Sequence, residues 1–226
     1  MEPPVIQRFG TLLVLRDDMI PGGTKRRVID YLLRGATEFV YASPAYGYAQ
    51  VALALACREA GYKATIFTAK RGTPHDRTLE AMRAEANVVM IPYGYLSNVQ
   101  SKAKRYAEER GARLLPFGFD TPEFGERLTA LAKSLPICPS EVWSVAGSGT
   151  LTRALQAAWP SARFYAIRVG ANADTGVAHA YQATEPFERN ARRPPPFPSC
   201  SNFDAKAWCY VEEYANPGAL FWNVAA

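Results

Sequence analysis

The sequence is poor in histidine and in paired cysteine. Its 226 residues include only two histidines and four cysteines, and no two cysteines form a Cys-x-x-Cys pair. A histidine-rich metal centre is therefore not expected, because zinc would need an unusual mixture of ligands. The N-terminus also lacks the basic and apolar regions of a signal peptide. The cysteines are therefore expected to be free thiols in a reducing cytoplasm.

Long apolar runs and nucleotide-binding signatures are missing too. No apolar stretch reaches the length that spans a bilayer. Neither a Gly-x-x-x-x-Gly-Lys run nor a Gly-x-Gly-x-x-Gly run occurs, which disfavours a plain nucleotide-binding domain. The composition, 48% hydrophobic and 21% charged, is that of a globular chain with core enough for one large domain or two small lobes.

A moderate excess of positive charge is present. The net charge of +5 permits attraction to an anionic partner, including nucleic acid, but does not require one. Arg189, Arg192 and Arg193 precede three prolines in a stretch without regular periodicity, from 170 to 202. Such a long connection is either functional, for example as a lid, or disordered.

Strand-like and helix-like segments alternate along the chain, which predicts an α/β fold with mainly parallel sheets. Strands are expected at 11–15, 38–42, 63–68, 87–91, 113–116, 141–146, 163–169 and 219–224. Helices are expected at 26–33, 48–60, 77–85, 97–110, 122–135, 150–159 and 203–214. Ser97 and Thr121 are candidate N-caps, and Gly61 and Gly111 candidate C-terminal stops.

Lys25 is the first candidate for chemistry. It follows Gly22, Gly23 and Thr24 and stands at the start of a predicted helix. Glycines allow a tight turn, and a desolvated lysine amine becomes a nucleophile suited to Schiff-base formation. The alternative is an exposed lysine in a polar turn.

Two further segments lead from a predicted strand into a predicted helix. The first is Ser43-Pro-Ala-Tyr-Gly-Tyr-Ala-Gln50, and the second is Gly147-Ser-Gly-Thr150. The second places small residues at a helix N-terminus, where unpaired N–H groups and the helix dipole favour phosphate. An ordinary tight turn would use the same residues.

In this order the three segments resemble the fold type II family of pyridoxal-phosphate enzymes, which includes tryptophan synthase β, cysteine synthase and aminocyclopropane-carboxylate deaminase. The resemblance runs from about Phe9 to Thr150. It implies two lobes with open parallel sheets in a chain that is shortened at its C-terminus, the larger lobe at 1–35 plus 117–226 and the smaller at 36–116. It also implies pyridoxal 5'-phosphate as cofactor, held by Lys25 through a Schiff base and by Gly147, Ser148, Gly149 and Thr150.

The resemblance also assigns the remaining roles. Ser43, Tyr46 and Gly47 would bind the substrate carboxylate, and Lys25 and Tyr48 would be the catalytic residues. The chain departs from the family where Gly47 replaces the asparagine that contacts the cofactor's ring hydroxyl, so that Tyr46 or Tyr48 is expected to supply a phenol there. Three neighbouring residues are candidate partners of the pyridine nitrogen: Ser199, Cys200 and Ser201.

The reaction is expected to occur at the α-carbon of an amino-acid group, with a homodimer as a possible assembly. The short length and altered loop resemble compact bacteriophage enzymes of thymine hypermodification. This resemblance puts decarboxylation of an amino-acid-modified thymidine nucleotide in phage DNA first. The alternatives are β-elimination, deamination or β-replacement on a free small amino acid, and a non-catalytic binder that retains the fold.

Overall fold

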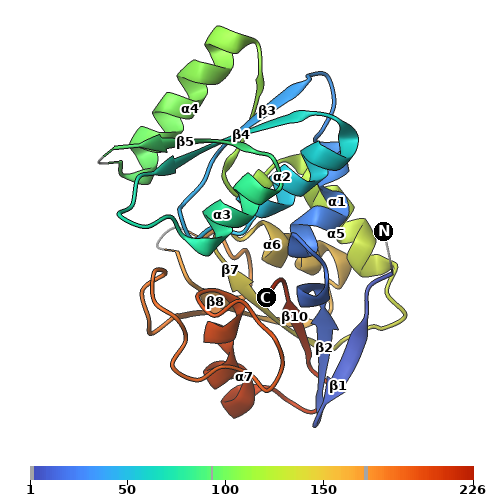
Figure 1. Cartoon of the computed structure of the whole chain (residues 1–226). Coiled ribbons are helices and arrows are strands. Elements are labelled where there is room, and N and C mark those ends of the chain that lie inside the picture. The colour runs from blue at the N-terminus through green and yellow to red at the C-terminus, as the bar shows by residue number, and fades with distance from the viewer. Residues whose placement is uncertain (1–2, 93, 171–172) are drawn as a thin grey trace. The chain divides into compact units, whose positions relative to one another are not determined.

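The computed structural model describes residues 3–92, 94–170 and 173–226, and its chain forms two compact units (Figure 1). Unit 1 contains the chain up to Thr24 together with Pro122–Ala226, and unit 2 is Lys25–Thr121. Each unit is built on its own sheet, so each is described by itself. None of the helices in the described part of the chain is long and apolar enough to cross a membrane.

Unit 1 contains a six-stranded sheet with the strand order β1-β2-β10-β7-β8-β9. The strands are β1 (Ile6–Phe9), β2 (Leu12–Arg16), β7 (Glu141–Ala146), β8 (Arg163–Arg168), β9 (His179–Gln182) and β10 (Leu220–Asn223). All neighbouring pairs are parallel except β1 and β2. The helices are α5 (Pro122–Lys133), α6 (Thr150–Ala158) and α7 (Trp208–Tyr214), with short 3-10 turns η1 (Asp17–Met19) and η4 (Asp204–Ala207).

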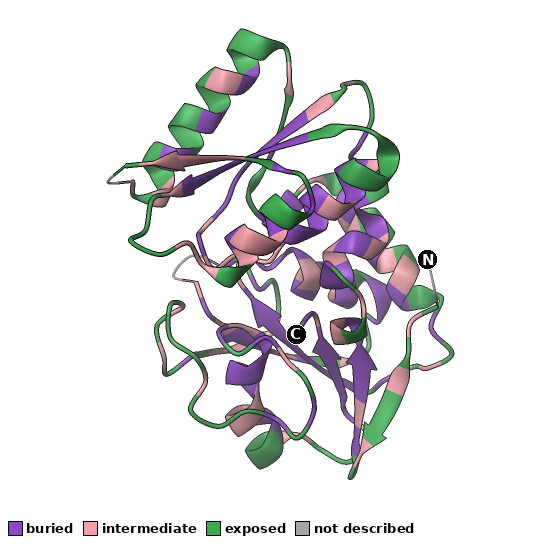
Figure 2. Ribbon diagram, in the orientation of Figure 1, coloured by how far each residue is buried: buried purple, intermediate pink, exposed green. Residues whose placement is uncertain are grey.

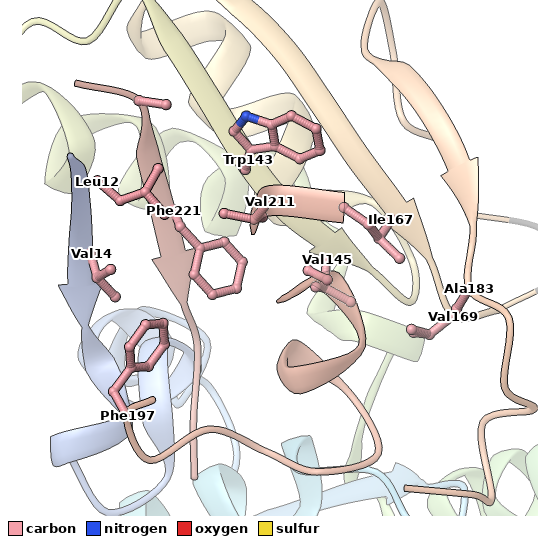
Figure 3. Close-up of a cluster of buried hydrophobic side chains, with 12 residues drawn as sticks. Leu12, Val14, Trp143, Val145, Ile167, Val169, Ala183, Phe197, Val211 and Phe221 are labelled. Atoms are coloured by element: carbon pink, nitrogen blue, oxygen red, sulfur yellow. The ribbon is translucent and has the colours of Figure 1, made fainter. Parts of the chain in front are cut away.

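The sheet of unit 1 buries both of its faces, as Figure 2 shows by the purple central strands. Successive residues of a strand point to opposite faces. Trp143 and Phe221 accordingly join the cluster of Figure 3, which also contains Val211 of α7. Their sequence neighbours Val142 and Trp222 join a second cluster with residues of α5 and α6. Strands of a sheet that is covered on both faces have continuous apolar sequences, and the central strands of this sheet do.

Unit 2 contains a four-stranded parallel sheet with the order β5-β4-β3-β6. The strands are β3 (Glu38–Ala42), β4 (Lys63–Ala69), β5 (Asn87–Ile91) and β6 (Arg113–Leu115). The helices are α2 (Ala49–Ala60), α3 (Asp76–Arg83) and α4 (Leu96–Arg110), with 3-10 turns η2 (Ile29–Tyr31) and η3 (Phe117–Phe119). Figure 1 shows α4 on one face of this sheet and α2 with α3 on the other. Helix α1 (Gly23–Val28) crosses the boundary between the units.

The α/β fold with parallel sheets is confirmed, and most expected elements appear within a few residues of their predicted bounds. Three local predictions were wrong. The stretch from 170 to 202 contains strand β9, which pairs with β8, and its alternating His-Ala-Tyr-Gln pattern is too short to stand out. Strand β1 was missed because it is a half-exposed edge strand. The N-cap of α4 is Tyr95, two residues before the predicted Ser97.

The unit boundaries also differ from the predicted lobes. Residues 25–35 and 117–121 belong to unit 2 rather than to the larger unit. Arg26 explains the first difference, because its buried guanidinium forms ion pairs with Asp30 and with Glu59 of α2. A sequence period cannot reveal such a partner, which lies 33 positions away.

Candidate active site

The turn before Lys25 is fixed by glycine. Gly22 and Gly23 have φ angles of +88° and +66°, a region that only glycine adopts easily. A Cβ on Gly23 would lie 2.3 Å from the backbone oxygen of Val224. Residue 23 must therefore be glycine for the start of α1 to lie against the end of β10.

Thr24 anchors the same turn inside unit 1. Its backbone N–H donates to Val224 O at 3.0 Å, and its hydroxyl donates to Asp17 Oδ2 at 2.6 Å. The indole N–H of Trp222 donates to that hydroxyl oxygen at 2.8 Å. All three side chains are buried, so this network holds the backbone immediately before Lys25 in one position.

The side chain of Lys25 is half-buried and contacts the η3 turn of unit 2. Its Nζ donates to the backbone oxygen of Gly118 at 3.1 Å. The same Nζ lies 5.7 Å from the ring centroid of Phe119, within the range of a cation–π contact. Lys25 is therefore held in place by specific contacts and is not the solvated turn lysine of the alternative interpretation.

The segment from Ser43 to Gln50 joins β3 to α2 and is shaped by one glutamine. Gln50 is fully buried, and its Nε2 donates to the backbone oxygens of Ala45 at 3.1 Å and Gly47 at 2.9 Å, with a longer contact to Pro44. Its Oε1 is buried without a hydrogen-bond partner among the described residues. Ser43 is buried at the end of β3, where its N–H donates to Phe67 O.

The two tyrosines of this segment contact basic side chains. Tyr46 lies 4.4 Å from the ring of His75, and the Arg71 guanidinium lies 5.8 Å from the Tyr46 ring. The guanidinium of Arg77 lies 4.4 Å from the ring of Tyr48. Burial lowers the pKa of His75, whose Nδ1 accepts the N–H of Arg77 as the N-cap of α3. This segment therefore borders a set of neutral and cationic groups in unit 2.

The segment from Gly147 to Thr150 joins β7 to α6 in unit 1. Gly149 has a φ of +91°, and a Cβ there would lie 1.7 Å from the backbone oxygen of Asp174. The hydroxyls of Ser148 and Thr150 lie 2.9 Å apart at the first turn of the helix, which has no acidic residue. Two hydroxyls and the amides of a helix N-terminus are the donors that suit a phosphate group.

The three candidates for the pyridine nitrogen are occupied by other contacts in unit 1. The hydroxyl of Ser199 donates to Asn223 Oδ1 at 2.8 Å, and the thiol of Cys200 donates to Asn202 Oδ1 at 3.2 Å. Ser201 is exposed and donates to Asn190. The arginines expected on an open loop are partly neutralised, since Arg193 pairs with Glu212 and Arg192 lies 3.9 Å from Glu185.

Sequence reasoning missed a buried carboxyl group in unit 1. Asp204 is fully buried, and its Oδ2 accepts the backbone N–H of Ala225 at 3.2 Å. Its Oδ1 has no hydrogen-bond partner among the described residues. Burial raises the pKa of Asp204 well above its ordinary value, and the carboxylates of Asp18 and Asp17 add to the rise. No local pattern marks this aspartate, because its burial depends on strands far away in the sequence.

Each candidate residue or segment is therefore held by contacts within a single unit. Lys25 and the segment from Ser43 to Gln50 belong to unit 2, and the segment from Gly147 to Thr150 belongs to unit 1. Each segment follows the carboxyl end of a parallel strand, the edge at which open α/β sheets bind ligands. Thr24, the residue before Lys25 in the sequence, contacts the end of β10 and the η1 turn within unit 1.

Comparison with known proteins supports the fold. No protein-family model and no curated protein matches the sequence. The structure of an ACC deaminase homologue is similar, with a TM-score of 0.83 at 13% identity, covering 100% of this chain and 90% of the other. The processed form of threonine deaminase isoform 2 from Solanum lycopersicum has a TM-score of 0.68 at 14% identity, covering 95% and 74%. Diaminopropionate ammonia lyase from Escherichia coli in its apo form has a TM-score of 0.68 at 14% identity, covering 95% and 77%.

At these identities the likeness concerns the fold. The TM-scores of 0.68 to 0.83 extend over 95% to 100% of this chain. The chain therefore has the fold of the fold type II pyridoxal-phosphate enzymes.

Proposed function

We propose that this protein is a pyridoxal-phosphate enzyme that catalyses elimination with release of ammonia from a free small amino acid. The observation that carries the proposal is the ordered set of Lys25, Ser43–Gln50 and Gly147–Thr150 on this fold. The similar solved structures are described as deaminases and an ammonia lyase. They favour the elimination alternative over decarboxylation of a modified thymidine nucleotide.

The residues present suit the cofactor by their chemistry. A phosphate group fits the hydroxyls of Ser148 and Thr150 at the start of α6, where Gly149 leaves no side chain in the way. The primary amine of Lys25 would hold the aldehyde group of the cofactor. When bound, the cofactor supplies an electron sink that stabilises negative charge at the α-carbon of an amino acid.

The chain's own residues would then bind the substrate and move its protons. The N–H groups and the Ser43 hydroxyl of the segment from Ser43 to Gln50 are suited to a carboxylate at the start of α2. Lys25 Nζ is the group suited to accept the proton from the α-carbon. Tyr48 is retained as a second catalytic candidate, because the Arg77 guanidinium at 4.4 Å orients its ring.

The choice of substrate rests on charge as well as on the comparisons. An anionic nucleic acid would need uncompensated basic residues. Two of the three arginines that the sequence offered for this purpose have acidic neighbours, Glu185 and Glu212. Elimination from a small amino acid needs the bound cofactor, the carboxylate-binding segment and a base, but no basic surface.

The test is the absorbance spectrum of the full chain with pyridoxal phosphate added, followed by assay of ammonia release from serine and threonine. Lys25→Ala is the variant that matters, and Lys133→Ala, at the end of α5, is the matched control. We expect a visible absorption band in the wild type and in Lys133→Ala and no band in Lys25→Ala. Ammonia release should follow the same pattern.

Other outcomes would redirect the assignment. A band without turnover of free amino acids, but with loss of CO2 from amino-acid-modified thymidine DNA, would replace elimination by decarboxylation. Absence of the band in the wild type would leave the non-catalytic binder as the better account.

A further inference from the structure

The turn that contacts Lys25 has an unusual backbone. Gly118 and Phe119 both have left-handed φ angles, +72° and +59°. Glycine adopts this region freely, but a bulky residue such as phenylalanine rarely does, so the backbone is strained at Phe119. Phe119 is nevertheless fully buried, and its N–H donates to Pro116 O at 2.9 Å. The surrounding structure therefore holds the turn in a conformation that the local sequence disfavours.

Tyr41, near the carboxyl end of β3, supports this turn. Its hydroxyl oxygen accepts the N–H of Gly118 at 3.4 Å, and its ring lies 5.0 Å from that of Phe119. Burial raises the pKa of Tyr41 to about 12, so the phenol stays uncharged at physiological pH. With its N–H bound to Tyr41, Gly118 presents its carbonyl oxygen to Lys25.

These contacts define one cluster around the lysine amine, formed by Gly118, Phe119 and Tyr41, which we call the lysine seat. All of its members lie in unit 2. A carbonyl oxygen and the face of an aromatic ring both favour an ammonium group over a neutral amine. The seat therefore stabilises the ammonium form of Lys25, which the amine takes once it has accepted a proton, relative to the uncharged form that attacks an aldehyde.

We propose that Phe119 and Tyr41 are positioning residues that hold the amine of Lys25 on the Gly118 carbonyl whenever it is not bonded to a cofactor. The strained turn holds the Lys25 amine at a fixed position. The amine therefore does not move into solvent when it is not bonded to a cofactor. The role of the lysine seat rests on the proposed function, in which Lys25 binds the cofactor. The effect of the seat on the Lys25 amine can be tested without any cofactor.

The first test measures the reactivity of Lys25 in the full chain without added cofactor. Acetic anhydride reacts with the uncharged amine only, and mass spectrometry of peptides gives the labelling rate of each lysine as a function of pH. Phe119→Leu keeps an apolar side chain but removes the ring. We expect its Lys25 labelling midpoint to move to lower pH, with the rate below the midpoint rising about two- to fivefold. Labelling of Lys133 in the same sample is the internal control.

Tyr41→Phe is the second variant and keeps both rings while removing the acceptor of the Gly118 N–H. It should move the Lys25 midpoint in the same direction by a smaller amount. Steric access alone would change the plateau rate and leave the midpoint in place. Urea unfolding of both variants checks that the fold is retained, and Tyr41→Phe decides the matter if Phe119→Leu does not fold.

The results separate the seat from the proposed function. Unchanged midpoints in both folded variants would overturn the seat. If the wild type forms its visible band with pyridoxal phosphate, Phe119→Leu should form the band about two- to fivefold faster at the same pH. If the wild type forms no band but the Lys25 midpoints of the variants are shifted, the lysine seat is supported and the proposed function is contradicted.

Discussion

The two strand-to-helix turns, Ser43–Gln50 in unit 2 and Gly147–Thr150 in unit 1, are built in different ways. The first is shaped by a side chain, because the amide of Gln50 donates to backbone oxygens of the turn itself. The second is shaped by the lack of one, because Asp174 O occupies the space of a Cβ on Gly149. A turn that a side chain holds is destabilised when that side chain loses its hydrogen-bond donors. A turn that close packing holds is destabilised when an atom is added. Substitutions at the two turns should therefore have separable effects.

The largest effect is expected for Gly149→Ala. The new Cβ would lie 1.7 Å from Asp174 O, and alanine is strained at a φ of +91°. We expect a loss of about 3 kcal/mol or more in the free energy of unfolding, and loss of phosphate binding. Gly218→Ala is the matched control, since Gly218 has a φ of +84° in the same unit with nothing within 4 Å. It should lose only about 1–2 kcal/mol, and equal losses in urea unfolding would contradict the packing argument.

Gln50→Leu should have the next largest effect. It leaves buried carbonyl oxygens of the Ser43–Gln50 turn without a donor, at a cost of about 1–3 kcal/mol. We expect KM for the amino acid to rise while the affinity for pyridoxal phosphate changes little. The exposed Gln100→Leu on α4 is the control. Equal loss of cofactor affinity and substrate binding would mean that the two turns do not act separately.

The two units should also respond differently to pH, because the buried carboxyl group of Asp204 lies in unit 1. The unfolded Asp204 ionises near its ordinary pKa of 3.8, whereas the folded carboxyl keeps its proton to higher pH. Unfolding above about pH 4 therefore releases a proton. The free energy of unfolding should fall with rising pH by about 1.4 kcal/mol per pH unit until the folded carboxyl ionises.

Asp204→Asn should remove this slope, since an amide does not ionise. Tryptophan fluorescence reports the unfolding of unit 1 alone, because all four tryptophans belong to it: Trp143, Trp159, Trp208 and Trp222. Urea unfolding monitored by tryptophan fluorescence at several pH values measures the slope directly. Glu126→Gln, an exposed carboxyl of α5, is the control. A wild-type slope that persists in Asp204→Asn would assign the proton to another group.

The smallest effect is expected for Ser148→Ala. It removes the hydroxyl that lies 2.9 Å from that of Thr150 and is a candidate phosphate donor. We expect about a tenfold loss of pyridoxal-phosphate affinity with KM for the amino acid unchanged, the reverse of Gln50→Leu. Fluorescence titration with the cofactor measures the affinity, and the exposed Ser134→Ala is the control. An unchanged affinity would remove Ser148 from the phosphate site.

Much of the architecture could be predicted from the sequence, because it depends on local patterns. Strands such as Glu38–Ala42, Asn87–Ile91 and Glu141–Ala146 carry apolar runs bounded by turn residues, and the structure gives them the expected bounds. The assignments of Lys25 and of the two turns to a cofactor and a substrate stay predictions. The structure adds the physical reasons for their glycines and for Gln50.

The sequence by itself determined the alternation of strands and helices, and the glycines that allow tight turns before Lys25 and after β7. These features depend on side-chain periodicity and on the freedom of residues without a Cβ, both of which are local. Only the tertiary structure decided the burial of Asp204, the left-handed backbone of Phe119 and the seat of Lys25. Each of these arises from contacts between residues far apart in the chain, such as Lys25 with Gly118, and no sequence period records such contacts.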